Sequence, residues 1–318
     1  MSKITPKDIE QAHNRIEPYI NKTPVLRSSA IDKLVGAEVY FKCENFQKVG
    51  AFKYRGATNT LLQLASNNKP TAVATHSSGN HAQALALAAR EQGIKAYIVM
   101  PNNSPKVKVK AVEGYGAEIT FCEPNLEARE STLARIVEET GAVFIHPYDR
   151  ANIIAGQGTA CLELNEEVRD LDVVVAPVGG GGLLSGTAIY AKSKGIEVYG
   201  AEPTGADDAK KSLTKGEIVP SVNPKTICDG LLTSLGELNF GYISDYVDDI
   251  WIANDEEILS AMRLIYERMK IVVEPSSAVT LAAILNNKSI VKGKKVGVII
   301  SGGNVDLDSF FEGYDLSY

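Results

Sequence analysis

Short apolar runs alternate with longer segments of helical periodicity along almost the whole chain. The runs are rich in β-branched residues, which predicts strands. Several are apolar on both faces, as is typical of parallel strands that helices cover on both sides. The predicted strands are Val39–Cys43, Thr71–Thr75, Lys95–Met100, Ala117–Phe121, Ala142–His146, Asp172–Val178, Glu197–Glu202, Asp249–Ala253 and Lys295–Ser301.

The segments between these strands repeat their apolar residues with helical spacing. Gly93, Gly116, Gly141 and Gly195 stand where four of them should end, since glycine commonly terminates helices. The predicted helices are Ala82–Gln92, Lys106–Tyr115, Leu126–Thr140, Leu183–Lys194, Glu256–Lys270 and Ser276–Leu285.

The alternation of strands and helices predicts a doubly wound α/β protein. Nine strands favour two sheets over one. We expect a large domain made of residues 1–71 plus 150–318 and a small α/β domain, 72–149, inserted in it. Ligands of such folds bind at the carboxyl ends of strands.

The amino-acid composition and net charge argue against several classes of function. The chain has 318 residues, 44% of them hydrophobic and 23% charged, as in ordinary soluble proteins. A net charge of −6 argues against nucleic-acid binding, and no apolar run is long enough to cross a bilayer. Without a signal segment or paired cysteine spacing, a cytoplasmic protein with reduced thiols is expected. The four histidines form no metal-binding pattern, so a histidine-based metal centre is not expected.

The most informative local feature is a run of four glycines, Gly179–Gly182, between a predicted buried strand and a predicted helix. Ordering glycine costs more backbone entropy than ordering any other residue. That cost is explained if backbone N–H groups must closely approach an anion, and a phosphate at a helix N-terminus is the usual case. Alone, the run predicts an anion site without identifying the anion.

Three further segments with polar or basic residues follow predicted strands. Lys53 lies near the start of a helix and is either a surface lysine or one that forms a Schiff base. The segment His76–His81 gathers hydroxyls, an amide and imidazoles at a helix N-terminus, although it also reads as a capped turn. Ser301–Asn304 is likewise either a turn or part of a site.

Together, and in this order, these segments closely resemble the fold-type II pyridoxal-phosphate enzymes of the serine/threonine dehydratase and serine racemase group. The resemblance extends from Thr23 to Asp306. Glu44–Lys53 is similar to the lysine signature of the group, and Ala155–Thr159 and Glu274-Pro275 match further segments. We expect no regulatory domain like that of long biosynthetic threonine dehydratases, because the Ser301–Asn304 segment lies near the end of the sequence.

The resemblance implies a tryptophan synthase β-like fold with pyridoxal 5′-phosphate in the cleft between two domains. Lys53 would bind the cofactor covalently, Phe52 would pack beside its ring and Asn80 would bond its phenolic oxygen. The phosphate would lie against Gly179, Gly180, Gly181, Gly182 and Leu183. Ser301 would face the pyridine nitrogen, and because a hydroxyl does not keep that nitrogen protonated, the cofactor would be a weaker electron sink suited to rapid β-elimination.

The same resemblance implies the reaction. Lys53 would remove the α-proton of a β-hydroxy amino acid, and loss of the hydroxyl would lead to a keto acid and ammonia. Ser78 stands where racemases of the group carry a second acid/base, so we expect a serine racemase that also dehydrates serine; the alternative is that Ser78 is only a turn residue. The expected substrate-binding residues are Ser77, Ser78, Asn80, His81, Arg129 and Ser234.

Two more sites are implied by the family. Glu202, the Ala206 carbonyl and Asp208 would bind a divalent cation; all-oxygen ligation suits Mg²⁺, with Ca²⁺ or Mn²⁺ as alternatives, and a solvated acidic loop is the competing reading. An activating nucleotide such as ATP would bind at a homodimer interface. The matching residues are Ser28, Ser29, Lys48, Gln83, Tyr115, Lys270 and Asn304. Ala30, Val49 and Tyr148 depart from the residues of the animal racemases.

Three other functions compete with the racemase. A 3-hydroxyaspartate dehydratase is the closest, because microbial members with that activity share the segments around Ser78 and Tyr148. A catabolic threonine dehydratase comes next. A silent phosphate- or nucleotide-binding protein is disfavoured by the presence of Lys53, Asn80 and Ser301 together.

Overall fold

The computed structural model describes residues 3–77, 79–104 and 106–306. Strands alternate with helices, as the sequence predicts. The strands are β1 (Val25–Leu26), β2 (Glu38–Cys43), β3 (Ala72–His76), β4 (Lys95–Pro101), β5 (Glu118–Cys122), β6 (Val143–Phe144), β7 (Val173–Pro177), β8 (Glu197–Pro203), β9 (Asp249–Ala253) and β10 (Lys295–Ile300).

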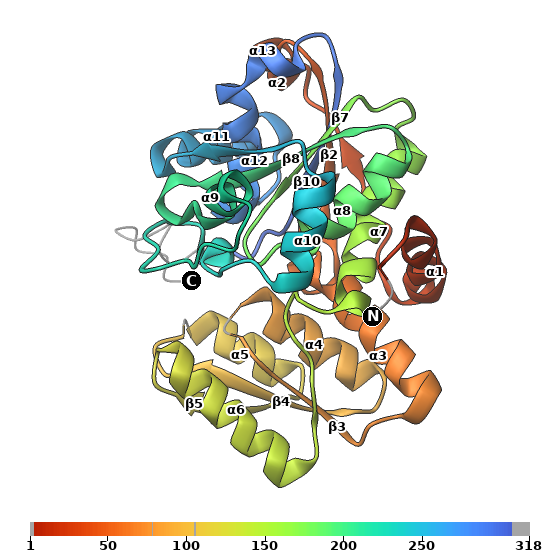
Figure 1. The fold of residues 1–318 in the computed structure, drawn as a ribbon, viewed down its shortest axis with the longest axis vertical. Helices are drawn as coiled ribbons and strands as arrows, with labels where there is room; N and C mark the ends of the chain where they lie inside the picture. The colour runs from red at the N-terminus through yellow and green to blue at the C-terminus, as the bar shows by residue number, and fades with distance from the viewer. Residues whose placement is uncertain (1–2, 78, 105, 307–318) are drawn as a thin grey trace, which may run out of the picture.

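The helices connect and cover these strands (Figure 1). They are α1 (Pro6–Ile16), α2 (Ser29–Val35), α3 (Lys53–Asn68), α4 (Asn80–Glu91), α5 (Lys106–Gly114), α6 (Leu126–Thr140), α7 (Ala151–Glu167), α8 (Gly182–Ser193), α9 (Asp208–Lys215), α10 (Glu237–Tyr246), α11 (Asp255–Met269), α12 (Pro275–Asn286) and α13 (Lys288–Val291). Five short 3₁₀ turns complete the described part: η1 (Glu17–Tyr19), η2 (Glu44–Phe46), η3 (Lys48–Gly50), η4 (Thr204–Ala206) and η5 (Asp229–Leu231).

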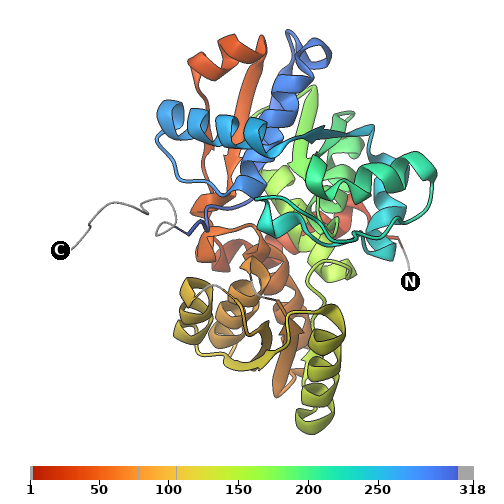
Figure 2. The ribbon, with the colours of Figure 1, turned by 90° about the vertical axis from the view of Figure 1, so that its left-hand side faces the viewer.

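Two sheets form, as expected from the number of strands. The larger has the order β1-β2-β10-β7-β8-β9 and is parallel except for β1, which pairs antiparallel with β2. The smaller is wholly parallel, in the order β5-β4-β3-β6. Figure 2 shows the elements of the smaller sheet gathered below those of the larger one. The predicted domain limits, 1–71 plus 150–318 and 72–149, remain a prediction about independent folding units.

The central strands are buried on both faces. Every residue of β7 is buried, and β10 is buried from Val296 onward, because helices cover both sides of the larger sheet. Helix ends follow the predicted glycines: Gly141 caps α6 with φ +66°, and Gly195 follows α8 with φ +76°. The carboxyl ends of β7, β8 and β10 therefore deliver their loops to one edge of the sheet.

Candidate active site

Lys53 is the first residue of α3, directly after Phe52 at the N-cap. Its Nζ donates a hydrogen bond to the Pro147 carbonyl at 3.0 Å and lies 5.9 Å from the centre of the Tyr148 ring. Burial lowers the pKa of Lys53 to about 8, against a smaller opposing effect of the Glu274 carboxylate. An amine with this pKa is partly neutral near physiological pH, so it can act as a nucleophile and as a base.

Ser301 joins the end of β10 to the lysine segment. Its carbonyl accepts a hydrogen bond from the Phe52 N–H at 2.9 Å. Its buried hydroxyl lies 2.9 Å from that of Ser277, a residue that the sequence analysis did not single out. Ser277 also bonds both the N–H and the carbonyl of Gly302. Among the described residues no carboxylate bonds either hydroxyl.

The four glycines form the turn between β7 and α8. Gly181 has φ +93°, and a Cβ there would lie 2.8 Å from the Cβ of Asn239. At Gly180 an added Cβ would lie 2.4 Å from the Tyr148 ring, so neither position has room for a side chain. Asn239, which the sequence analysis missed, holds the turn by donating to the Gly180 carbonyl at 2.9 Å. The free N–H groups of the α8 N-terminus, which Leu183 continues, suit a phosphate.

Asn80 begins α4 and belongs to a polar network that the sequence did not reveal. Its amide donates to both carboxylate oxygens of Glu274, at 3.0 and 3.2 Å, and its carbonyl oxygen accepts from Asn304 at 2.9 Å. Burial, reinforced by the nearby Asp229 carboxylate, raises the pKa of Glu274 to about 7. In sequence, Glu274 was only part of a family match before Pro275, and no local pattern marks it as a site residue.

The substrate-side residues are only partly brought together. Ser77 extends from β3, its N–H bonded to the Val99 carbonyl, while Ser78 lies outside the described residues. His81 is buried near Lys53, and burial, followed by the lysine charge, lowers its pKa well below the usual value.

Arg129 lies on α6, and Ser234 lies in the loop between η5 and α10. Arg129 extends from α6 and lies near His76, whose pKa is lowered by burial and then by the arginine charge. Ser234 accepts a hydrogen bond from the Ser221 N–H, and the next residue, Leu235, comes within 3.0 Å of a Cβ built on Gly181. The two residues therefore flank the site on the side of the smaller sheet and of the glycine turn, respectively.

The predicted cation ligands follow β8. Asp208 is 4% exposed, and neither of its carboxylate oxygens accepts a hydrogen bond from another described residue, although Ser221 lies nearby. Glu202 accepts backbone N–H bonds at 2.9 Å from Ala209 and Lys210. Burial raises the pKa of Glu202 to about 8 and that of Asp208 to about 6. A buried, unpartnered carboxylate beside a second one fits a hydrated divalent cation.

The residues matched to a nucleotide lie in two places. Lys48, Gln83, Tyr115 and Asn304 surround η3 and α4: Lys48 pairs with Glu91 at 2.9 Å, the Tyr115 ring packs against Arg90, and Asn304 donates to the Val49 carbonyl. Ser28 caps α2, Ser29 begins it, and Lys270 caps α11, which contacts α2.

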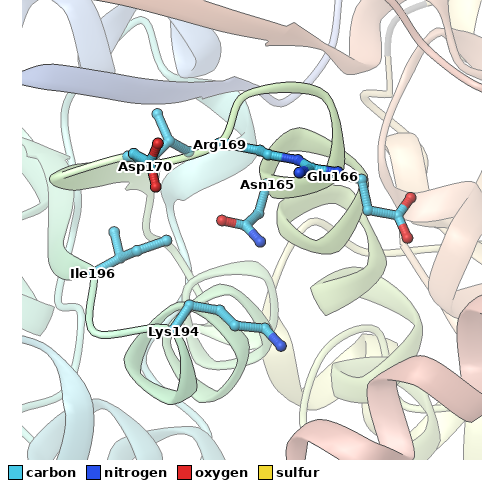
Figure 3. A pocket seen from close by; sticks show the side chains of 7 residues that line it. Asn165, Glu166, Arg169, Asp170, Lys194 and Ile196 are labelled. Atoms are coloured by element: carbon cyan, nitrogen blue, oxygen red, sulfur yellow. The ribbon is translucent and has the colours of Figure 1, made fainter.

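A surface pocket of about 510 Å³ lies away from this site. It lies where α7 and α8 end, and Figure 3 shows Asn165 and Lys194 among the side chains that line it. Helix α8 is twelve residues long, so this pocket is about 18 Å from the glycine turn at the other end of the helix. None of the residues that line it is among those predicted for the site.

Comparison with known proteins agrees with this geometry. The family model described as "Pyridoxal-phosphate dependent enzyme" matches residues 16–302. A serine racemase of Dictyostelium discoideum is 53% identical over 315 residues, covering 97% of each chain. A beta-hydroxyaspartate dehydratase of Paracoccus denitrificans is 49% identical over 306 residues, covering 96% of this chain and 97% of its own.

A solved structure extends the similarity to the fold. Maize serine racemase superposes with a TM-score of 0.95 at 45% identity, covering 98% of this chain and 97% of its own. The fold is therefore that of the fold-type II enzymes, as the sequence predicts. The chain is a member of the pyridoxal-phosphate-dependent enzyme family.

Proposed function

We propose that the protein is a serine racemase that also dehydrates serine to pyruvate and ammonia. The observation that carries the proposal is the buried Lys53 amine, whose pKa burial lowers to about 8. Its neighbour Phe52 bonds Ser301, and the Tyr148 ring beside it packs on Gly180 of the glycine turn. When bound, pyridoxal phosphate supplies an electron sink that makes the α-C–H of an amino acid acidic. The sequence similarity to named serine racemases supports the same substrate.

In this proposal each residue has a simple task. The Gly179–Gly182 turn and Leu183 bind the phosphate, Phe52 and Asn80 contact the ring, and Ser301 accepts or donates one hydrogen bond at the ring nitrogen. Lys53 holds the cofactor and takes the α-proton on its own face of the ring. Ser77 and His81 bind the substrate carboxylate, and Ser78 exchanges a proton on the opposite face.

A dehydratase of 3-hydroxyaspartate is the second candidate. Arg129 supports it, because the buried Nε of this side chain has no hydrogen-bonding partner among the described residues and could meet a second carboxylate. The Paracoccus relative supports it as well. A catabolic threonine dehydratase remains the third.

A substrate panel tests the proposal. L-serine, D-serine, L-threonine and the 3-hydroxyaspartates are offered separately, and keto acid and product enantiomer are followed for each. We expect D-serine and pyruvate from L-serine. Turnover of a 3-hydroxyaspartate with at least a hundredfold higher kcat/KM than L-serine, and no enantiomer exchange, would replace the racemase by the second candidate.

Replacing Ser78 by alanine should separate the two activities. The change removes the hydroxyl proposed to act on the second face, so racemisation should fall on the order of 100-fold or more. Elimination from L-serine needs only the Lys53 face and should stay within a few-fold of wild type; measured in the same preparation, it is the internal control. Equal loss of both activities would remove Ser78 from the mechanism.

We further propose that Glu202, Ala206 and Asp208 bind Mg²⁺, or Ca²⁺ or Mn²⁺ in its place. The unpartnered carboxylate of Asp208 supports this site. Cation at about 100 times its Kd would stabilise the fold by about 3 kcal/mol. For a chain of 318 residues that is a rise in Tm of roughly 4–5 °C.

The Asp208→Asn variant should abolish this rise in Tm. The matched control is Asp207→Asn, because the Asp207 carboxylate of the wild type pairs with Lys211 and is not a proposed ligand. Because protons compete for ligands whose pKa burial has raised to about 6 and about 8, the rise should grow with increasing pH across this range. Unchanged Tm of the wild type after chelation would exclude the cation.

The proposal includes a cytoplasmic homodimer and an activating nucleotide such as ATP. The nucleotide site is supported by three of its proposed residues, which lie together around η3 and α4: Lys48, Gln83 and Asn304. Exposed apolar side chains of Leu34 and Leu259 support a subunit contact on α2 and α11. Within the described residues, no helix combines the length and hydropathy needed to span a membrane.

A further inference from the structure

Helix α7 lies between the two helices whose first turns form the site (Figure 1). Lys53 begins α3, and the glycine turn leads into α8. Helix α7 packs against both, and it is buried continuously from Ile153 to Leu164. The distance between the lysine and the glycine turn therefore depends on how closely α7 lets its two neighbours approach.

On the α3 side the contact is made through glycine. A Cβ built on Gly156 of α7 would lie 2.6 Å from the Cα of Gly56 and 2.8 Å from the carbonyl oxygen of Arg55. A Cβ on Gly56 would lie 2.9 Å from the Ile153 carbonyl oxygen. Ordinary carbon contacts need about 3.5 Å, so a single methyl group here would force the two backbones apart.

The α8 side repeats the arrangement. A Cβ built on Gly186 of α8 would lie 2.4 Å from the Ile154 carbonyl oxygen and 2.6 Å from the N atom of Gly158. A Cβ on Gly158 would lie 2.8 Å from the Gly186 carbonyl oxygen. Both helix pairs thus approach as closely as their backbones permit.

A buried ionic cluster also joins α3 to α7. Arg55, fully buried, donates to both carboxylate oxygens of Glu163 on α7, at 2.7 and 2.8 Å, and to both of Glu44, at 2.7 and 2.8 Å. Lys42 pairs with Glu163 at 2.7 Å, which balances the two carboxylates with two cations. Such a bidentate arrangement is geometrically specific and resists sliding of α3 along α7.

We propose that α7 is a spacer that sets the distance between Lys53 and the glycine turn to the length of the cofactor. This inference rests on the proposed cofactor contacts. A ligand fixed at both ends, by a covalent bond and by a phosphate cradle, tolerates little change in the separation of its anchors. Gly156, Gly158, Gly186 and Arg55 are then positioning residues, although none of them contacts the ligand.

The test uses ligands that bind to only one of the two anchors, either to Lys53 or to the glycine turn. Pyridoxal lacks the phosphate and reports on Lys53 through its imine absorbance. 4-Deoxypyridoxine 5′-phosphate lacks the aldehyde and reports on the glycine turn by calorimetry. Both are measured, with pyridoxal phosphate, on wild type, Gly156→Ala and Gly186→Ala. Gly241→Ala in α10 is the matched control, since no atom lies within 4 Å of its added Cβ.

If α7 acts as a spacer, the variants should lose affinity for the ligand that binds both anchors and keep it for the ligands that bind one. In Gly156→Ala and Gly186→Ala, pyridoxal phosphate should bind roughly 100-fold more weakly, since displacement of about 1 Å has effects of this size. Each one-ended ligand should keep its wild-type affinity within about threefold, and Gly241→Ala should bind all three ligands as wild type does. Unchanged affinity for pyridoxal phosphate, or equal weakening of a one-ended ligand, would overturn the proposal.

If the proposed cofactor contacts are wrong, the wild type will bind neither pyridoxal nor 4-deoxypyridoxine 5′-phosphate. This outcome differs from the failure of the spacer, which shows only in the variants. If an alanine variant does not fold, Arg55→Lys replaces it. Lysine keeps the charge but cannot bridge Glu44 and Glu163 with paired hydrogen bonds. It should show the same selective loss for pyridoxal phosphate, on the order of 10-fold, and weakening of pyridoxal to the same extent would overturn the spacer.

Discussion

Replacement of Lys53 by alanine is expected to abolish catalysis, with kcat/KM falling by roughly 10⁴ or more, since both the covalent anchor and the general base are lost. The visible absorbance of the lysine-bound cofactor should disappear at the same time. The phosphate end of the site remains, so dialysed protein should still retain some cofactor noncovalently. The measurements are a spectral titration and single-turnover kinetics.

Lys288→Ala is the matched control, because this lysine is exposed on α13. It should leave both spectrum and rate unchanged. Persistence of the visible band in Lys53→Ala would mean that another amine holds the cofactor, and the assignment of Lys53 would be wrong.

In ligand-free protein, Lys53 should differ from exposed lysines in the pH at which its amine loses its proton. Because burial lowers the pKa of Lys53 to about 8, its amine becomes the neutral, reactive form as pH rises through about 8. An exposed lysine does so near pH 10.4. Site-resolved amine labelling against pH should therefore show Lys53 reacting with a midpoint near pH 8. A midpoint near pH 10, as for a lysine in water, would contradict the environment described for Lys53.

The second large effect is expected at Gly180. A methyl group there would meet the Tyr148 ring at 2.4 Å, so Gly180→Ala must displace the ring or the turn. We expect the affinity for pyridoxal phosphate to fall roughly 100-fold, as for other displacements of about 1 Å in a site. Equilibrium dialysis and the absorbance of the bound cofactor measure this loss.

The cause can be tested by removing the ring. If the clash with Tyr148 is responsible, Gly180→Ala/Tyr148→Ala should regain about 10-fold in affinity relative to Gly180→Ala, a coupling within the usual range for residues in contact. Gly114→Ala, whose added Cβ has no neighbour within 4 Å, is the control and should bind as wild type does. No recovery in the double variant would show that the ligand itself occupies the space at Gly180.

Local sequence predicted most of what is local in this structure. The strand predicted at Asp172–Val178 is β7, and that at Lys295–Ser301 is β10, because continuous β-branched runs are sufficient to identify buried parallel strands. Helix α7 was not predicted, since a helix buried on all sides lacks the polar face that gives a periodic signal. Strand β1, with two residues, is too short for any pattern to detect.

For the site, the sequence by itself determined which backbone turns and reactive groups the protein possesses: the glycine run before α8, Lys53 after a strand, and a serine at the end of β10. Glycine content, strand ends and residue chemistry are properties of short segments, and they also carried the family resemblance. Only the tertiary structure decided the protonation, hydrogen bonding and packing of these groups. The lowered pKa of Lys53, the network of Glu274 with Asn80, and the glycine contacts between α7 and α3 depend on segments about one hundred residues or more apart. Burial and packing arise only when those segments meet, so no local pattern in the chain encodes them.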